Sequence, residues 1–314
     1  MITALHQSLE KATEYLLRQQ QEDGVWRDYD MKPGQSDAWI TAVVGLSLRK
    51  QPCSPMAYNP LEKALQAINR IGRADGWGYN SATPCDADCN AWCIRFISNM
   101  DYCIWPNLLQ RYFSPYILPD GRVRTFPDPR FGTWAEPHQD VAPLVGLALY
   151  PLHESWCRRI CDAAVAGYSE PALWHSFWWD TDSYAIAHNI ELLSVTGRLT
   201  ERIKSGVMHW LSRLKPPENA FETAWRLSVA AELIPPETQY GLRYAVELLS
   251  CQNQDGSWPG GAALLLPPQF RGDAGATTPV YQDQNRLMTT ACAVYAVKQW
   301  LGKTGILKNP KADQ

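Results

Sequence analysis

Two acidic residues and a cysteine lie close together in the segment GWGYNSATPCDADCNAWC, residues 76–93. The acids are Asp86 and Asp88, and the cysteine is Cys89. A carboxylic acid donates a proton only if it stays protonated, and both burial and a neighbouring carboxylate raise its pKa. Asp86 could share or relay the proton of Asp88, and the Cys89 thiol could give Asp88 a weak hydrogen bond. The segment therefore predicts a general acid.

The same segment has two other interpretations. Aspartate is a favoured N-cap and suits the positive end of the helix dipole, so either acid could simply cap a helix. Alternatively, Cys85, Cys89 and Cys93 could bind a metal ion, because their spacing places them on one face of a helix. Zinc sites usually close with C-x2-C or paired histidines, however, and Pro84 indicates that Cys85 precedes the helix. We expect no metal ion and no cofactor.

Repeated motifs indicate the architecture that positions these acids. The pattern Q-x-x-D-G-x-W occurs at residues 20–26 and 252–258, each time after an amphipathic helix, and weaker copies lie at residues 75–79 and near Asp120. We expect a structural role: a turn at Asp-Gly, with the tryptophan packed on the neighbouring hairpin. More apolar segments follow the copies, and they begin at Ser36, Asp86, His138, Asp180, Phe221 and Asp283.

Six pairs of an amphipathic outer helix and an apolar inner helix predict an all-α fold, an (α/α)6 toroid. No segment shows the alternation of a strand. We expect residues 1–302 to form this single barrel domain and residues 303–314 to form a C-terminal tail. All the inner helices would run in the same direction, so their N-terminal acids would surround one mouth of the barrel: Asp37, Asp88, Asp140, Asp182 and Glu222.

Aromatic residues gather near the starts of these inner helices, in a chain with 14 Trp and 14 Tyr. A cation over one aromatic face gains about 0.5–2 kcal/mol, so several faces could guide a carbocation through a cavity. The alternative is plain core packing, because tryptophan fills wide junctions between helices. The candidate cavity residues are Trp39, Trp92, Trp134, Phe177, Trp178, Trp179, Tyr184 and Trp225.

Two basic or titratable side chains are further candidates at the mouth. His138 opens the inner segment next to that of Asp88, so it could orient or reprotonate the acid, or else act as a cap or lie on the surface. Arg286 could contact a diphosphate that anchors the substrate, as could Arg271, although both could also be ordinary surface charges. The chain has no D-D-x-x-D run and therefore no obvious magnesium site for diphosphate departure.

Composition excludes several other classes of protein. Hydrophobic residues make up 46% and charged residues 19% of the 314 residues, as in a soluble globular protein. The net charge of -3, without a basic run, predicts no nucleic-acid partner. The N-terminus has the pattern of a polar amphipathic helix rather than of a signal peptide. Nine cysteines, an odd number, indicate reduced thiols in a cytoplasmic protein.

These motifs resemble the squalene and oxidosqualene cyclases and their class II terpene cyclase relatives. The repeats resemble theirs over nearly the whole chain, and GWGYNSATPCDADCNAW resembles the stretch that leads into their D-x-D-D-T-A motif. The resemblance implies that Asp88 is the proton donor and Asp86 the first acid of the motif. Cys89 and Asn90 replace Asp and Thr, and Asp-Cys is the version found in the oxidosqualene branch, which opens epoxides. Squalene-type cyclases have two barrels, so we expect a smaller cavity here, or one completed by a partner chain.

We therefore expect a metal-independent class II terpene cyclase of the (α/α)6 fold. Asp88 would protonate an alkene or epoxide of a small isoprenoid or meroterpenoid. Asp86, Cys89 and His138 would adjust the acidity of Asp88. The aromatic residues would stabilise the carbocations, and deprotonation or water capture would end the reaction.

Several alternatives stay open at this point. The toroid could bind a ligand without this catalysis or with a different one. It could also resemble the zinc-dependent prenyltransferases, but their Asp and Cys ligands are two residues apart, and Ile40 stands where they carry a zinc histidine. A homodimer and a peripheral membrane contact through the apolar loop 259–270 are also compatible with the sequence.

Overall fold

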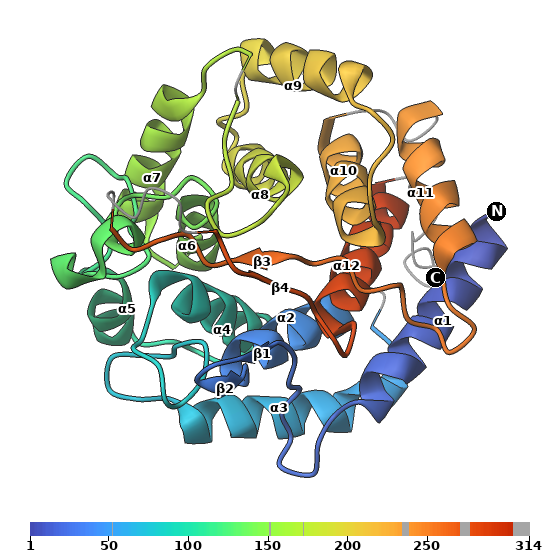
Figure 1. Cartoon of the computed structure of the whole chain (residues 1–314), viewed down its shortest axis with the longest axis horizontal. Helices are drawn as coiled ribbons and strands as arrows, with labels where there is room; N and C mark the ends of the chain where they lie inside the picture. The colour runs from blue at the N-terminus through green and yellow to red at the C-terminus, as the bar shows by residue number, and fades with distance from the viewer. Residues whose placement is uncertain (52, 151, 172, 234–238, 271–276, 304–314) are drawn as a thin grey trace, which may run out of the picture.

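The computed structural model describes residues 1–51, 53–150, 152–171, 173–233, 239–270 and 277–303. Its helices form two concentric rings (Figure 1). The outer ring consists of α1 (Ile2–Arg18), α3 (Tyr58–Ile71), α5 (Pro106–Phe113), α7 (Glu154–Gly167), α9 (Glu201–Arg213) and α11 (Gln239–Cys251). The inner ring consists of α2 (Ala38–Arg49), α4 (Ala87–Asn99), α6 (Ala142–Leu149), α8 (Asp182–Val195), α10 (Ala220–Leu233) and α12 (Leu287–Lys303).

Contacts between inner helices close the ring. Each inner helix packs against the next one, and α12 packs against α2. The predicted all-α (α/α)6 toroid is therefore confirmed. Each inner helix begins within a few residues of the start predicted from the sequence, because the change from an amphipathic to an apolar pattern is a local property of the chain.

The two rings differ in how much of each helix is buried. Outer helix α3 buries a single stripe that includes Leu61, Leu65 and Ile68, residues spaced by one helical turn. Inner helix α2 buries every residue from Ala38 to Leu48. An amphipathic helix can bury only one face, whereas a helix that is apolar all round needs neighbours on every side.

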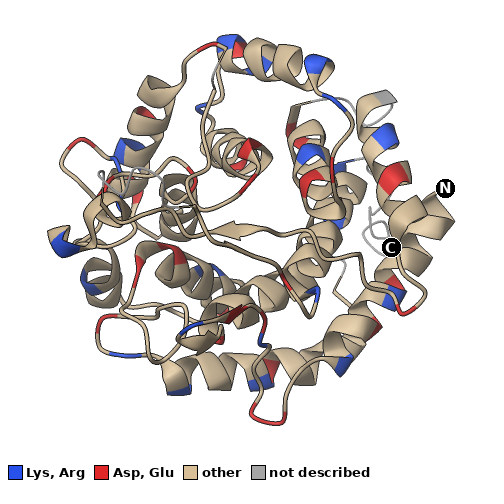
Figure 2. Cartoon of the chain, viewed as in Figure 1, with Lys and Arg blue, Asp and Glu red and all other residues tan. Residues whose placement is uncertain are grey.

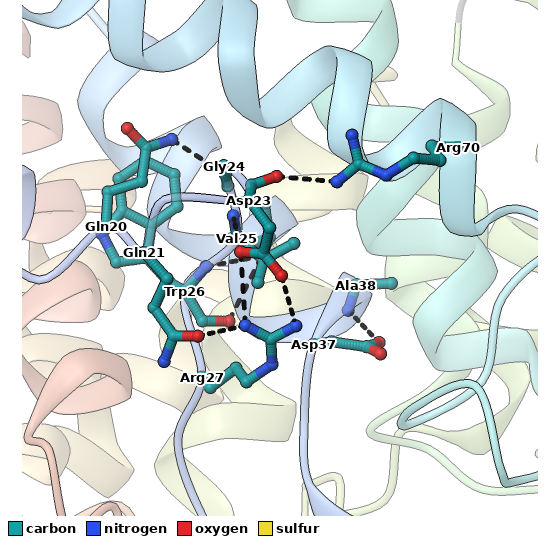
Figure 3. A network of polar contacts seen from close by, with 11 residues as sticks. Gln20, Gln21, Asp23, Gly24, Val25, Trp26, Arg27, Asp37, Ala38 and Arg70 are labelled. Carbon is teal, nitrogen blue, oxygen red and sulfur yellow. Dashed lines mark hydrogen bonds and ion pairs between the residues drawn. The ribbon is translucent and has the colours of Figure 1, made fainter.

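The Q-x-x-D-G-x-W repeats form the joints between outer and inner helices (Figure 3). In the first copy, Trp26 is fully buried, and its Nε1 donates a hydrogen bond of 2.6 Å to the Leu16 carbonyl in α1. The Gln20 amide donates to the Pro60 carbonyl in α3 over 2.9 Å. The glutamine thus reaches the neighbouring hairpin, while the tryptophan is tied to the helix that precedes it.

The last copy of the motif makes the same bonds. Trp258 Nε1 donates to the Leu248 carbonyl of the preceding helix, α11, and the Gln252 amide donates to the Ser8 carbonyl of α1. Since α1 is the outer helix that follows α11 around the ring, this bond joins the two ends of the chain. The motif joins successive helices, but its glutamine, and not its tryptophan as the sequence analysis expected, makes the hydrogen bond to the neighbouring hairpin.

Gly24 is the residue at the first joint where the backbone requires glycine. Its φ is +90°, and a Cβ would lie 2.7 Å from the Lys63 carbonyl oxygen. Gly24→Ala is expected to lower the free energy of unfolding by about 1–3 kcal/mol, because an L-residue is strained there. In Gly302→Ala the new Cβ would meet nothing, so stability should stay the same or rise by up to about 1 kcal/mol. Denaturant unfolding measures the stability of both variants. Equal effects would contradict the conclusion that the backbone at position 24 requires glycine.

Two short antiparallel hairpins complete the described fold. β1 (Asp30–Met31) pairs with β2 (Gly34–Gln35), and β3 (Leu264–Leu265) pairs with β4 (Val280–Tyr281). In Figure 1, β3 and β4 cross the middle of the ring. Figure 2 shows that these two strands carry no charged residue, whereas charged residues lie along the outer helices. The apolar loop 259–270, which includes β3, therefore extends over the barrel.

Within the described residues, no helix is both long enough and apolar enough to pass through a membrane. The predicted tail, residues 303–314, lies outside the described residues except for Lys303, the last residue of α12.

Candidate active site

A cavity of about 330 Å³ lies where the inner helices begin. Inner helices α2, α4 and α8 supply side chains from their first turns, and both hairpins and the loops before α4, α6 and α8 supply the rest of the wall. The barrel topology thus brings together segments that are far apart in the sequence. The cavity-lining residues that the sequence analysis singled out are Trp39, Asp86, Asp88, Cys89, Trp134, Asp140, Trp178, Trp179 and Tyr184.

Aromatic rings pack against one another in tilted and T-shaped pairs around this cavity. The ring centroids of Trp39 and Trp179 are 6.0 Å apart, and those of Trp179 and Tyr184 are 5.0 Å apart. Trp134 and Trp178 are 5.3 Å apart. All five residues line the cavity, so a ligand inside it meets aromatic faces from several sides.

Sequence reasoning missed part of the wall. Phe126 and Phe131 stack at 4.6 Å, and both precede α6 in a region without helical periodicity. Hairpin residues complete the wall without a motif that would have identified them. Tyr79 could have been identified from the sequence, since it lies in the same segment, residues 76–93, as Asp86 and Asp88. The missed lining residues include Lys32, Tyr79, Phe126, Phe131, Leu264, Leu266 and Tyr281.

Asp88 lies in the first turn of α4 and lines the cavity. Among the described residues, no group donates a hydrogen bond to its carboxyl oxygens. Burial raises the pKa of Asp88 well above its usual value, the negative charges of Asp86 and Asp140 raise it further, and Arg95 opposes them. The carboxyl group therefore stays protonated well above the pH at which a free aspartate ionises.

Asp86 is the N-cap of α4. Its Oδ1 accepts a hydrogen bond of 2.8 Å from the Cys89 backbone N–H, and the Cys89 thiol also bonds to it. The thiol thus pairs with Asp86, not with Asp88 as the sequence analysis expected. Burial raises the pKa of Asp86 to about 6, although the bonds from Cys89 lower it. Asp86 is thus both the cap of this helix and part of the cavity wall.

Asp140 is a third carboxyl group at the cavity. Its Oδ2 accepts hydrogen bonds of 2.8 Å from the backbone N–H groups of both Phe177 and Trp178, and its Oδ1 is buried without a hydrogen bond in the described structure. Burial raises its pKa to about 6 against the effect of those two donors. Asp140 therefore fixes the backbone that carries Trp178 into the cavity wall.

The structure does not bring His138 to Asp88. Its Nε2 lies 3.0 Å from the Thr133 carbonyl and must donate to it, so Nδ1 accepts from the Thr125 hydroxyl at 2.8 Å. Burial lowers the pKa of His138 to about 4, which keeps the ring neutral. Thr125 also accepts a bond of 2.9 Å from Trp178 Nε1. His138 therefore holds the Trp178 indole in place through Thr125.

Four other candidate residues lie outside the cavity lining. Phe177 stacks on His138 at 3.8 Å, on the far side of the wall. Trp92 and Trp225 are buried deeper in the interior of the barrel, where they pack against His188. Arg286 pairs with Asp255 at 3.0 Å and lies over the Tyr15 ring, next to an outer helix.

The cysteines near Asp88 do not converge on one point. Arg73 donates to Cys85 Sγ over 3.0 Å, whereas the Cys93 thiol faces the Ala38 carbonyl of α2. Burial raises the pKa of Cys89 well above its usual value, which keeps it a neutral thiol. In the part of the chain that the structure describes, no three His, Cys, Asp or Glu side chains group as metal ligands.

Several solved structures share this fold. The type II terpene cyclase MstE from Scytonema, in complex with its substrate geranylgeranyl dihydroxybenzoate, matches with a TM-score of 0.83 at 21% sequence identity, over 96% of this chain and 98% of that chain. The ent-copalyl diphosphate synthase from Streptomyces platensis matches with a TM-score of 0.60 at 16% identity, over 85% of this chain and 50% of that chain.

A glycosidase also shares the helical toroid. An α-1,6-mannanase from Salegentibacter, in complex with α-1,6-mannotriose, matches with a TM-score of 0.57 at 10% identity, over 95% of this chain and 99% of that chain. No protein-family model matches the sequence, and no curated protein does. The chain thus has the fold of class II terpene cyclases, and its chemistry must be argued from its own cavity.

Proposed function

We propose that this chain is a class II terpene cyclase that starts the cyclisation of an isoprenoid or meroterpenoid by protonating an alkene or an epoxide. One observation carries the proposal. Within the described residues, the Asp88 carboxyl group has no hydrogen-bond partner and faces an aromatic cavity, with Asp86 and Asp140 beside it to keep it protonated. A neutral carboxylic acid in a dry site can transfer its proton to a weakly basic substrate.

In the proposed reaction, the Asp88 O–H bond breaks and the proton bonds either to a terminal alkene carbon, whose π bond breaks, or to an epoxide oxygen, whose C–O bond then breaks and leaves a hydroxyl group. The resulting cationic carbon takes an electron pair from the next double bond, which closes a ring and moves the charge along the chain. Trp39, Trp179 and Tyr184 line the path and stabilise the cation with their π faces, each by about 0.5–2 kcal/mol. Loss of a proton or capture of water ends the reaction.

The cavity wall also favours a terpenoid over a sugar. A glycosidase site needs hydrogen-bonding side chains for the hydroxyl groups of each sugar ring, whereas this cavity is lined mainly by aromatic and other apolar side chains. The substrate of MstE, geranylgeranyl dihydroxybenzoate, is an isoprenoid chain on an aromatic acid, and an apolar chain of this kind suits such a wall. A toroid that only binds its ligand is the remaining alternative.

A cytoplasmic location is part of the proposal. All nine cysteines are free thiols, which supports a reducing compartment. Phe270, in the loop after β3, and Val280, in β4, are 59% and 53% exposed, and they support a peripheral membrane contact for an apolar substrate.

The direct test is incubation of the purified, metal-stripped protein with linear isoprenoids, prenylated aromatic acids and the terminal epoxides of both, read by mass spectrometry. Cyclic products are expected, isomeric with the substrate where proton loss ends the reaction and heavier by one water where water capture ends it. A folded protein that binds these compounds but forms neither kind of cyclic product, with or without added zinc or magnesium, would instead indicate a binding toroid.

Asp86 should set the pH range of the reaction through Asp88. The negative charge of Asp86 raises the pKa of Asp88, so Asp86→Asn should lower that pKa. The acid then loses its proton at a lower pH, and the alkaline limb of the kcat profile should move to lower pH. Asparagine is as good an N-cap as aspartate, so the helix should persist. An unchanged alkaline limb in a folded Asp86→Asn variant would argue against Asp88 as the titrating acid.

A further inference from the structure

Lys32 stands at the rim of the cavity on a rigid support. It lies in the turn between β1 and β2, and among the described residues it is the one basic side chain that lines the cavity. The Asn80 amide donates to the carbonyls of Pro33 and Gln35, both over 3.0 Å. Gly34 has a φ of +98°, which closes the turn. The hairpin that carries the ammonium group is thus fixed against the loop that leads to Asp86.

The charge of Lys32 has no partner in the described part of the chain. Two basic residues in other loops are each paired with an aspartate, Arg27 with Asp23 and Arg130 with Asp128. Lys32 makes no such pair, although it lies beside a mainly apolar wall. A cation at the edge of an apolar cavity attracts an anion more strongly than a cation in open water does.

The opposite charge gathers deeper in the cavity. Asp86 and Asp140 are buried at 5% and 1% exposure next to Asp88, whereas Lys32 is exposed. An anionic group is repelled where carboxylates gather and attracted where the ammonium lies. An apolar chain, in contrast, gains by burial among the aromatic residues. An amphiphile therefore has one favoured orientation in this cavity.

We infer that Lys32 binds an anionic head group, a carboxylate or a diphosphate, and that the substrate enters with its isoprenoid end toward Asp88. The inference rests on the proposed cyclase function and specifies its substrate class. Lys32 takes the role that the sequence analysis gave to Arg286, which is paired with Asp255 away from the cavity. A neutral isoprenoid would lack this contact and bind more weakly.

The test compares three ligands with the same isoprenyl chain: a prenylated aromatic carboxylic acid, its methyl ester and the prenyl diphosphate. Lys32→Ala should raise KM for the anionic ligand by about tenfold or more and change kcat little, since a charge-assisted hydrogen bond is lost. Lys32→Arg should restore most of the affinity. Lys63→Ala, at an exposed lysine of α3, removes the same charge far from the cavity and should leave KM unchanged.

The ester and the ionic strength complete the design. KM for the ester should be high in the wild type and insensitive to Lys32→Ala, and added salt should raise KM only for the charged ligand. The larger effect of Lys32→Ala, on the acid or on the diphosphate, identifies the head group. Equal KM values for acid and ester, or no effect of Lys32→Ala on either anion, would overturn the inference while leaving the cyclase function intact.

Ligand binding to an Asp88→Asn variant distinguishes a failure of the head-group site from a failure of the proposed cyclase function. Quenching of tryptophan fluorescence reports Kd without turnover. If the anion binds in a Lys32-dependent manner but the wild type never cyclises it, the head-group site stands and the proposed function fails. If binding is independent of Lys32 and of the head-group charge, the site itself is refuted.

Discussion

Asp88→Asn is expected to lower kcat about 100- to 10,000-fold, the usual contribution of a general acid, while the protein stays folded. The amide has the shape of the carboxylic acid but no acidic proton. Neither neighbouring acid can replace it, because Asp86 is bonded to Cys89 and Asp140 to the backbone of residues 177 and 178. Cyclic products are measured by mass spectrometry, and turnover is compared at matched substrate concentrations.

The stability of this variant has a defined dependence on pH. Burial raises the pKa of Asp88 above that of the unfolded chain, so its contribution to stability is present at low pH and lost as the pH rises through the folded pKa. Asparagine does not titrate, and Asp88→Asn should therefore gain stability relative to the wild type as the pH rises. Glu201→Gln, at an exposed acid in the first turn of α9, is the control and should change neither activity nor this trend. Wild-type turnover in a folded Asp88→Asn protein would refute the proposed acid.

Glu191→Gln is expected to lower the free energy of unfolding by about 3–5 kcal/mol, because it leaves a buried arginine without its counter-charge. Arg95 Nη2 lies 3.1 Å from Glu191 Oε1, and the two side chains are 8% and 13% exposed. The Tyr295 hydroxyl donates to the same carboxylate. These residues belong to α4, α8 and α12, so the network joins three inner helices across the barrel. Denaturant unfolding with a constant m-value measures the loss.

An exposed ion pair provides the comparison. Glu154→Gln removes the partner of Arg158 on α7, where both side chains are more than half exposed, and it should cost less than about 1 kcal/mol. Burial alone would raise the pKa of Glu191, but Arg95, Lys50 and His188 hold it below its usual value. Its contribution to stability is therefore present above the unfolded pKa and lost as the pH falls. Glu191→Gln should flatten this acid limb, and equal costs for the two variants would refute the buried network.

The position along each inner helix explains why some of the aromatic residues that were predicted to line the cavity do so and others do not. Trp39 and Tyr184 are the second and third residues of α2 and α8, and both line the cavity. Trp92 and Trp225 are each the sixth residue of their helices. Three or four residues deeper means about 4.5–6 Å further down the barrel, at 1.5 Å per residue. The sequence places all four aromatic residues near the starts of inner helices. A difference of about one helical turn then decides whether a side chain lines the cavity or packs in the core.

The sequence by itself determined the double ring, the approximate start of each inner helix and the acid pair on α4, because apolar periodicity and turn residues act within a few positions of the chain. Only the tertiary structure decided what surrounds those acids. It tied the Cys89 thiol to Asp86, turned His138 toward Thr125, and placed Lys32 and Leu264 at the same cavity. Those contacts join loops that are distant in the sequence, and their geometry depends on how the closed ring brings the loops together above the inner helices.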